Sequence, residues 1–190
     1  MLDKSKLTGA DISIDFCGCH LQSPYILSSG PLCYGAEGMI KGHEAGAGAV
    51  VTKTIRLGAA INPVHHMGTV NQDSLINCEK WADSDRLNWY ENEIPKTVAA
   101  GAVVIGSVGH TLKEAQAIVK DVERAGAHMI ELVSYTEDTL LPMLDYTKEH
   151  VDIPVSASCP ATGPTLRQPP GDAWSTAPTE SAPLIPSDPH

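Results

Sequence analysis

Residues 45–54 read AGAGAVVTKT, and this stretch decides the fold class. Small residues and glycines lead into two valines, and a lysine then stands between two threonines. Glycine permits the positive φ that ends a helix, and a short apolar run without alternation is typical of a parallel strand covered on both faces. The stretch therefore predicts a joint between a helix and a buried strand, with Lys53 at the carboxyl end of that strand.

The same joint recurs along the chain, in EAGAGAVVTK (44–53), AAGAVVIGS (99–107) and RAGAHMIEL (124–132). We predict strands at 25–29, 49–53, 102–107, 129–133 and 153–158. We predict helices at 35–45, 86–98, 111–126 and 137–150, and a small hairpin formed by 12–16 and 19–22. This alternation predicts an α/β protein with right-handed crossovers. Five strands suit an open doubly wound sheet, whereas a (β/α)8 barrel needs eight.

The helix predicted over 111–126 has the clearest start signal. Thr111 is its expected N-cap, and Glu114 follows three residues later, which is a capping box. The buried stripe of this helix is then formed by Leu112, Ala115, Ile118, Val119 and Val122.

The composition changes near residue 158. We predict one body over 1–158, and a disordered Pro-rich tail over 159–190, where eight of the fourteen prolines lie. A segment without apolar periodicity buries too little surface to offset its ordering entropy. The alternative is an extended arm that docks on the body through Trp174 or the PLIP segment.

Charge and cysteine usage exclude several classes of protein. The net charge of −10 and the pI near 5.1 argue against a nucleic-acid-binding protein, which needs a basic patch. No apolar stretch reaches the ~18 residues of a membrane span, and the first residues have no apolar segment typical of a secretory signal. Five irregularly spaced cysteines indicate a reduced, cytoplasmic protein, and the pair Cys17 and Cys19 lacks partners for a zinc site.

Ligands of parallel α/β folds bind at the carboxyl ends of the strands. Most residues predicted there are small: they include Ser28, Ser29, Gly30, Thr54, Ser107, Ser134, Ser156 and Ser158. Lys53 is the only cation among the residues predicted at these strand ends. Such a rim suits a flat polar ligand with carbonyls and ring nitrogens, and the alternative is that Lys53 merely extends to solvent.

Residues 55–83 are predicted to form a long irregular connection, and such connections are usually functional or disordered. Asn71 and Asn77 offer paired donor and acceptor groups that match a pyrimidine-like edge. The neighbouring His65 and His66 are expected to be surface histidines rather than metal ligands.

Several motifs in this order resemble one family. They are SPYILSSGP, AGAGAVVTKTI followed by NP, NQDSLIN, GSVGHTLKE and AGAHMIELV. Together, from about Ile12 to Val155, they resemble the class 1 dihydroorotate dehydrogenases and their relatives in dihydropyrimidine dehydrogenase.

The resemblance implies a (β/α)8 TIM barrel with a hairpin under its floor and FMN at the carboxyl ends of the strands. It implies that the flavin is held by Ser28, Ser29, Gly30, Lys53, Thr54 and Ser107. It implies that Asn71 and Asn77 bind a dihydropyrimidine substrate, whose C6 hydride passes to flavin N5 as C5 loses a proton. The expected partners are the substrate and a second copy or an electron-transfer subunit.

The chain also departs from the family pattern. Val133 stands where the family has an asparagine, and no cysteine base follows, although Ser134 or Tyr135 could take that role. Ser158-Cys159-Pro160 imitates the base motif, but its spacing assigns it to the next strand. The last three barrel strands and the phosphate loops have no counterpart, which indicates a barrel truncated after about five strands.

Three hypotheses follow from these observations. The first is an FMN-dependent oxidoreductase of pyrimidine metabolism. The second is a catalytically inactive fragment of such an enzyme. The third is an unrelated α/β enzyme in which Lys53 forms a Schiff base.

Overall fold

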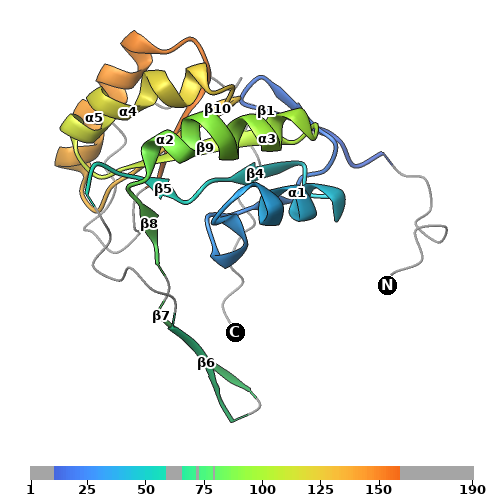
Figure 1. Ribbon diagram of the computed structural model, residues 1–190. Coiled ribbons are helices and arrows are strands. Elements are labelled where there is room, and N and C mark those ends of the chain that lie inside the picture. Colours follow the sequence, from blue (N-terminus) through green and yellow to red (C-terminus); the bar gives the residue numbers. More distant parts are fainter. Residues whose placement is uncertain (1–10, 59–65, 72, 79, 159–190) are drawn as a thin grey trace, which may run out of the picture.

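The strands form a curled parallel sheet, which makes the molecule a mixed α/β half-barrel (Figure 1). The computed structural model describes residues 11–58, 66–71, 73–78 and 80–158. Five strands follow one another in the order β11-β10-β9-β4-β3, and every neighbouring pair is parallel. Their bounds are β3 (Ile26–Leu27), β4 (Ala49–Val51), β9 (Val103–Gly109), β10 (Met129–Val133) and β11 (Val155–Ser158).

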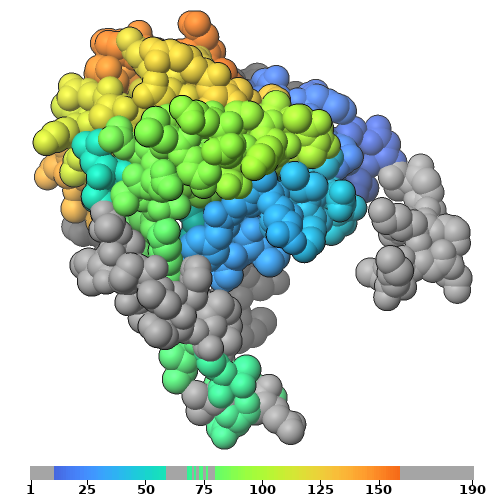
Figure 2. Space-filling view, viewed as in Figure 1, coloured from blue at the N-terminus to red at the C-terminus, as the bar shows by residue number. Residues whose placement is uncertain are grey.

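Helices cover one face of this sheet. They are α1 (Ala36–Glu44), α2 (Arg86–Asn88), α3 (Ile94–Ala99), α4 (Leu112–Arg124) and α5 (Glu137–His150). A π-helical turn, Trp89–Glu93, joins α2 to α3, so the helix predicted over 86–98 is confirmed with an irregular middle. In the space-filling view these helices form a continuous surface (Figure 2). Among the described residues, no helix combines the length and the apolarity that crossing a membrane requires.

The three predicted joints are confirmed by their backbone conformation. Gly46 follows α1 with φ 108°, Gly101 follows α3 with φ 89°, and Gly126 follows α4 with φ 99°. A positive φ just after the last helical turn is the conformation in which glycine is favoured, and it directs the chain back toward the sheet. The sequence pattern therefore located three of the strands through their turns.

The amino-terminal hairpin is confirmed as β1 (Ile14–Phe16) paired with β2 (Cys19–Leu21). Its two loop residues, Cys17 and Gly18, have φ of 49° and 80°. Positive φ at both positions is the type I′ turn that fits the twist of a two-residue hairpin. The hairpin packs through Leu21 on the inner face of the sheet, in a cluster with Ala49, Val51, Ile105 and Met129.

The prediction of an irregular connection over 55–83 was wrong for the part that the structure describes. This part contains β5 (Thr54–Ile55), the antiparallel pair β6 (His66–Val70) and β7 (Ser74–Cys78), and β8 (Ala82–Asp83). Asn71, with φ 59°, lies in the turn between β6 and β7. The prediction missed this hairpin because a left-handed asparagine supplies the turn that glycine usually marks.

Some predictions fall outside the described residues. They concern His65 in the connection, Cys159, Trp174 and the whole tail over 159–190.

Candidate functional site

The inner face of the sheet carries its side chains in layers. Because side chains alternate along a strand, residues that are partners in register share a layer. The lower layer is apolar and holds Val51, Ile105 and Met129. The next layer toward the carboxyl ends is polar and holds Ser107, Glu131 and Ser156. The inner face thus changes from apolar to polar within one step along the strands.

A bulge lies at the same level, where β4 continues into β5. Val51 pairs with Ile105, but Ile55 pairs with Val108. The chain advances by four residues from Val51 to Ile55, but β9 advances by only three residues from Ile105 to Val108. The segment between β4 and β5 therefore contains one extra residue. Bulges of this kind redirect side chains and are frequent beside active sites.

Thr52 links the bulge to β9 through both its main chain and its side chain. Its N–H donates to the Ile105 carbonyl at 3.0 Å, and its Oγ1 accepts from the N–H of Ser107 at 2.9 Å. As a result, two successive residues, Lys53 and Thr54, both reach the same cavity.

A pocket of about 310 Å³ opens at the carboxyl ends of the strands. Its lining includes Ser28, Ser29, Val51, Lys53, Thr54, Trp81, Ser107, His110, Glu131, Val133 and Tyr135. Five of the residues predicted for the site, Ser28, Ser29, Lys53, Thr54 and Ser107, therefore line one cavity.

Lys53 is only 1% exposed, so its side chain does not extend to solvent. Its Nζ donates to the Ser29 carbonyl at 3.4 Å and lies 5.0 Å from the centre of the Tyr34 ring. The site therefore holds a buried amine that lies between a carbonyl and an aromatic face. Beside it, the hydroxyls of Thr54 and Ser107 are 3.2 Å apart.

Three other predicted site residues are not among the described residues that line the pocket. Gly30 precedes the 3-10 turn Pro31–Cys33, and its carbonyl accepts from the N–H of Cys33 at 3.0 Å. Asn71 and Asn77 lie on the hairpin of β6 and β7, which projects away from the half-barrel (Figure 1). Gly30 is thus next in the chain to the lining residue Ser29, whereas Asn71 and Asn77 belong to the hairpin.

Three polar or aromatic lining residues, Trp81, His110 and Glu131, were not predicted, and Tyr135 was named only as a possible base. His110 follows β9 directly, and it was missed because β9 runs two residues past its predicted end at 107. Glu131 had a usable signal, since it is a charged residue inside the apolar run MIELV. Burial raises the pKa of the Glu131 carboxyl, and a hydrogen bond with Ser107 opposes that shift.

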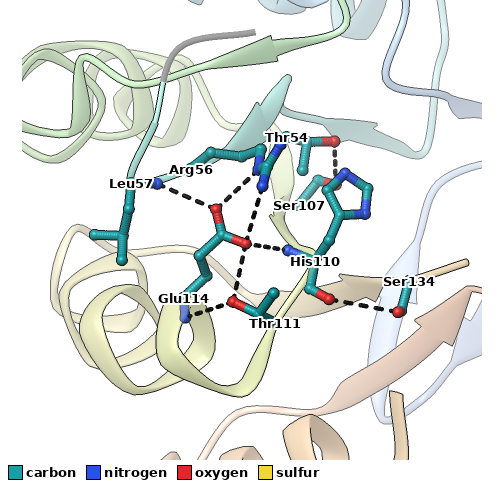
Figure 3. Close-up of polar contacts among 8 residues, drawn as sticks. All are labelled: Thr54, Arg56, Leu57, Ser107, His110, Thr111, Glu114 and Ser134. Carbon is teal, nitrogen blue, oxygen red and sulfur yellow. Dashed lines mark hydrogen bonds and ion pairs between the residues drawn. The ribbon is translucent and has the colours of Figure 1, made fainter. Parts of the chain in front are cut away.

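A buried ion pair supports the pocket from the side of α4 (Figure 3). The Glu114 carboxylate accepts from Arg56 Nε at 2.8 Å, from the N–H of Leu57 at 3.3 Å and from the N–H of His110 at 2.5 Å. Burial raises the pKa of Glu114, but its bonds with Arg56 and with main-chain N–H groups outweigh burial and lower it.

The predicted capping box is confirmed in part. The Thr111 hydroxyl accepts from the N–H of Glu114 at 3.3 Å, as expected for an N-cap. The Glu114 carboxylate, however, reaches the N–H of His110, one residue before the N-cap, and it also accepts from the Thr111 hydroxyl at 3.2 Å.

The ring of His110 lies among aromatic side chains at the pocket. It stacks on Tyr135, with centroids 4.8 Å apart and planes at 9°, and it meets Trp81 edge-on at 5.2 Å. Burial and the nearby Arg56 charge lower the pKa of His110, while the Glu114 charge and the main chain of Val133 partly offset them. The neutral imidazole is therefore the form present at neutral pH.

The two candidates for a substitute base differ in their surroundings. Ser134 is 1% exposed, and its hydroxyl contacts the Thr139 hydroxyl and the His110 carbonyl. Tyr135 is 66% exposed and lines the pocket. Ser134 therefore supports the loop, and Tyr135 is the one of the two that reaches the cavity.

Among the described residues, no group of three or more histidine, cysteine or carboxylate side chains could hold a metal ion. The chain matches no protein-family model, and a search of curated proteins returns no match.

Proposed function

We propose that the pocket binds the isoalloxazine ring of FMN, and that the protein is an oxidoreductase of the dihydroorotate and dihydropyrimidine dehydrogenase type. In this proposal the half-barrel corresponds to the first five strands of a (β/α)8 barrel. The observation that carries it is Lys53, which is held in the pocket by the Ser29 carbonyl and the Tyr34 ring. Ser28, Ser29, Thr54 and Ser107 line the same cavity.

The pocket residues fit the ring of a flavin. A volume of about 310 Å³ lies at the lower end of the range for small-molecule sites. The polar edge of the ring needs hydrogen-bond donors, which Lys53 and the serine hydroxyls supply. Val51, Val133 and Trp81 offer apolar surface to its faces. No second lysine or arginine is among the described lining residues, so these residues fit the ring rather than the phosphate.

A bound flavin would supply the capacity to accept a hydride from a dihydropyrimidine. The residues of this chain prepare the site for it. Lys53, fixed in a poorly hydrated position, stabilises negative charge on a ligand edge placed against it. The Thr54 and Ser107 hydroxyls orient one another and the ligand. Glu131, whose pKa is raised by burial, holds a proton inside the cavity up to a higher pH than an exposed glutamate.

A second candidate is a flavin-binding protein without dehydrogenase activity. It is favoured by Val133 at the rim and by the Ser134 hydroxyl, which contacts Thr139 and the His110 carbonyl. Among the lining residues that the structure describes there is no cysteine.

Both candidates are tested by titrating riboflavin and FMN into the purified chain and following flavin absorption and fluorescence. We expect the two flavins to bind with similar affinity, because the described residues contact the ring. Dihydroorotate or dihydrouracil is then added without oxygen. Bleaching of the flavin supports the oxidoreductase, and a bound flavin that stays oxidised supports the inactive binder. If neither flavin binds, both candidates are overturned.

A further inference from the structure

The main chain of His110 is fixed on both sides. Its N–H donates to the Glu114 carboxylate at 2.5 Å, and its carbonyl accepts from the Ser134 hydroxyl at 3.5 Å (Figure 3). Glu114 is itself held by Arg56. The residue is therefore anchored by α4 and by the segment after β10, which are two separate parts of the chain.

The ring of His110 is also fixed. Tyr135 stacks on it at 4.8 Å, and Trp81 meets it edge-on at 5.2 Å. These contacts restrain the plane of the imidazole without using its nitrogens. Aromatic contacts of this kind hold a side chain by shape and by the ring quadrupole.

Both ring nitrogens of His110 are buried, and neither makes a hydrogen bond of normal geometry to a described residue, although the main chain of Val133 lies close enough to the ring to raise its pKa slightly. Buried polar atoms in native proteins nearly always have a partner, so an exception calls for an explanation. The ring lines the pocket that also contains Lys53 and Glu131. A ligand in that pocket would supply the partner that the protein does not.

The charges around His110 define the form that meets such a ligand. Arg56 and Glu114 face it from the side of β5 and α4. Lys53, between β4 and β5, and Glu131, on β10, face the same cavity. Burial and Arg56 lower the pKa of His110, so the ring is neutral and has one N–H donor and one lone-pair acceptor.

We propose that His110 is a ligand-binding residue of this pocket, where a ring nitrogen hydrogen-bonds to the polar edge of a planar heterocycle that carries both carbonyl and N–H groups. Such an edge occurs both in a flavin and in a free pyrimidine. The pocket supports this ligand class, because it combines a donor-only amine with hydroxyls, a neutral imidazole and aromatic walls. The inference rests on the proposed function only for the choice of probes.

The test labels the histidine rings with 15N and follows them by NMR as riboflavin or uracil is added. The signals of His110 are identified by their loss in His110→Phe, which keeps an aromatic ring but removes both nitrogens. We expect the His110 signals to shift, His110→Phe to bind about tenfold more weakly, and His110→Gln, which keeps a donor and an acceptor, to bind with intermediate affinity. The exposed His20→Gln is the matched control and should bind as the wild type does.

The outcomes separate this inference from the proposed function. If riboflavin binds but the His110 signals do not move, or His110→Phe and His110→Gln bind unchanged, the inference is overturned and the flavin site stands. If riboflavin does not bind and uracil moves the His110 signals, the inference stands and the flavin proposal fails. If neither probe moves them, the inference is overturned. Thermal unfolding of each variant shows that it is folded.

Discussion

The Oγ1 of Thr52 accepts a hydrogen bond from the main-chain N–H of Ser107 at 2.9 Å, and both residues are fully buried. This contact replaces a strand-to-strand hydrogen bond at the bulge where β4 continues into β5. It allows Lys53 and Thr54 to face the pocket one after the other. The geometry of the candidate site therefore depends on Thr52, which is not one of the described residues that line the pocket.

Replacing Thr52 tests the role of this bond. Thr52→Val has nearly the same shape but leaves the buried N–H of Ser107 without its acceptor. We expect the free energy of unfolding to fall by about 1–3 kcal/mol, measured by urea denaturation. Thr52→Ser keeps the hydroxyl and should lose less. Equal stability of Thr52→Val and the wild type would show that the bulge does not need this bond.

Glu114 should matter far more for stability than an exposed glutamate. Glu114→Ala leaves Arg56 and the N–H groups of Leu57 and His110 without a buried carboxylate, so we expect a loss of about 3 kcal/mol. The control is Glu37→Ala, which breaks an exposed pair with Lys41 and should change stability little.

The contribution of Glu114 should also depend on pH. Its pKa is lowered in the folded chain, so the unfolded chain binds more protons in acid. The stabilisation is present above the ordinary glutamate pKa of 4.5 and is lost as the pH falls through the lower folded value. Urea denaturation at several pH values should therefore show the gap between wild type and Glu114→Ala narrowing in acid. A gap that is constant with pH would contradict the ion-pair account.

Glu131 should behave in the opposite way. Burial raises its pKa, so the stability that it contributes is present below 4.5 and is lost as the pH rises through the folded value. Glu131→Gln should therefore raise the thermal unfolding temperature at pH 7 and lose this advantage below pH 4.5. The exposed Glu149→Gln is the control. A destabilised Glu131→Gln at pH 7 would indicate that the charged carboxylate has a partner that stabilises it.

The helix ends and strands that were predicted correctly are determined by short local patterns in the sequence. Gly46, Gly101 and Gly126 each end a helix by a conformation that glycine favours, and the apolar runs that follow are too short and too continuous for anything but buried strands. The predicted carboxyl ends of the strands then pointed to Lys53 and Ser107, and both residues line the pocket.

The rest depends on contacts between distant segments. The bulge at Thr52 is visible only in the register of β4 and β5 against β9, which no local pattern encodes. His110 was missed because β9 continues through Gly109, two residues past the end predicted at Ser107. Glu131 was overlooked because periodicity alone does not show that a charged residue in a buried strand faces a cavity.

The central claim is that Lys53 holds the polar edge of a flavin ring, and its most direct test is riboflavin binding to Lys53→Met. Methionine keeps the length and bulk of the side chain but removes the charged donor. We predict that fluorescence titration shows the dissociation constant rising about tenfold or more, since a hydrogen bond from a charged group is lost. Lys120→Met, on the exposed face of α4, should bind as the wild type does. Riboflavin binding that is equally tight in Lys53→Met and the wild type would contradict the account.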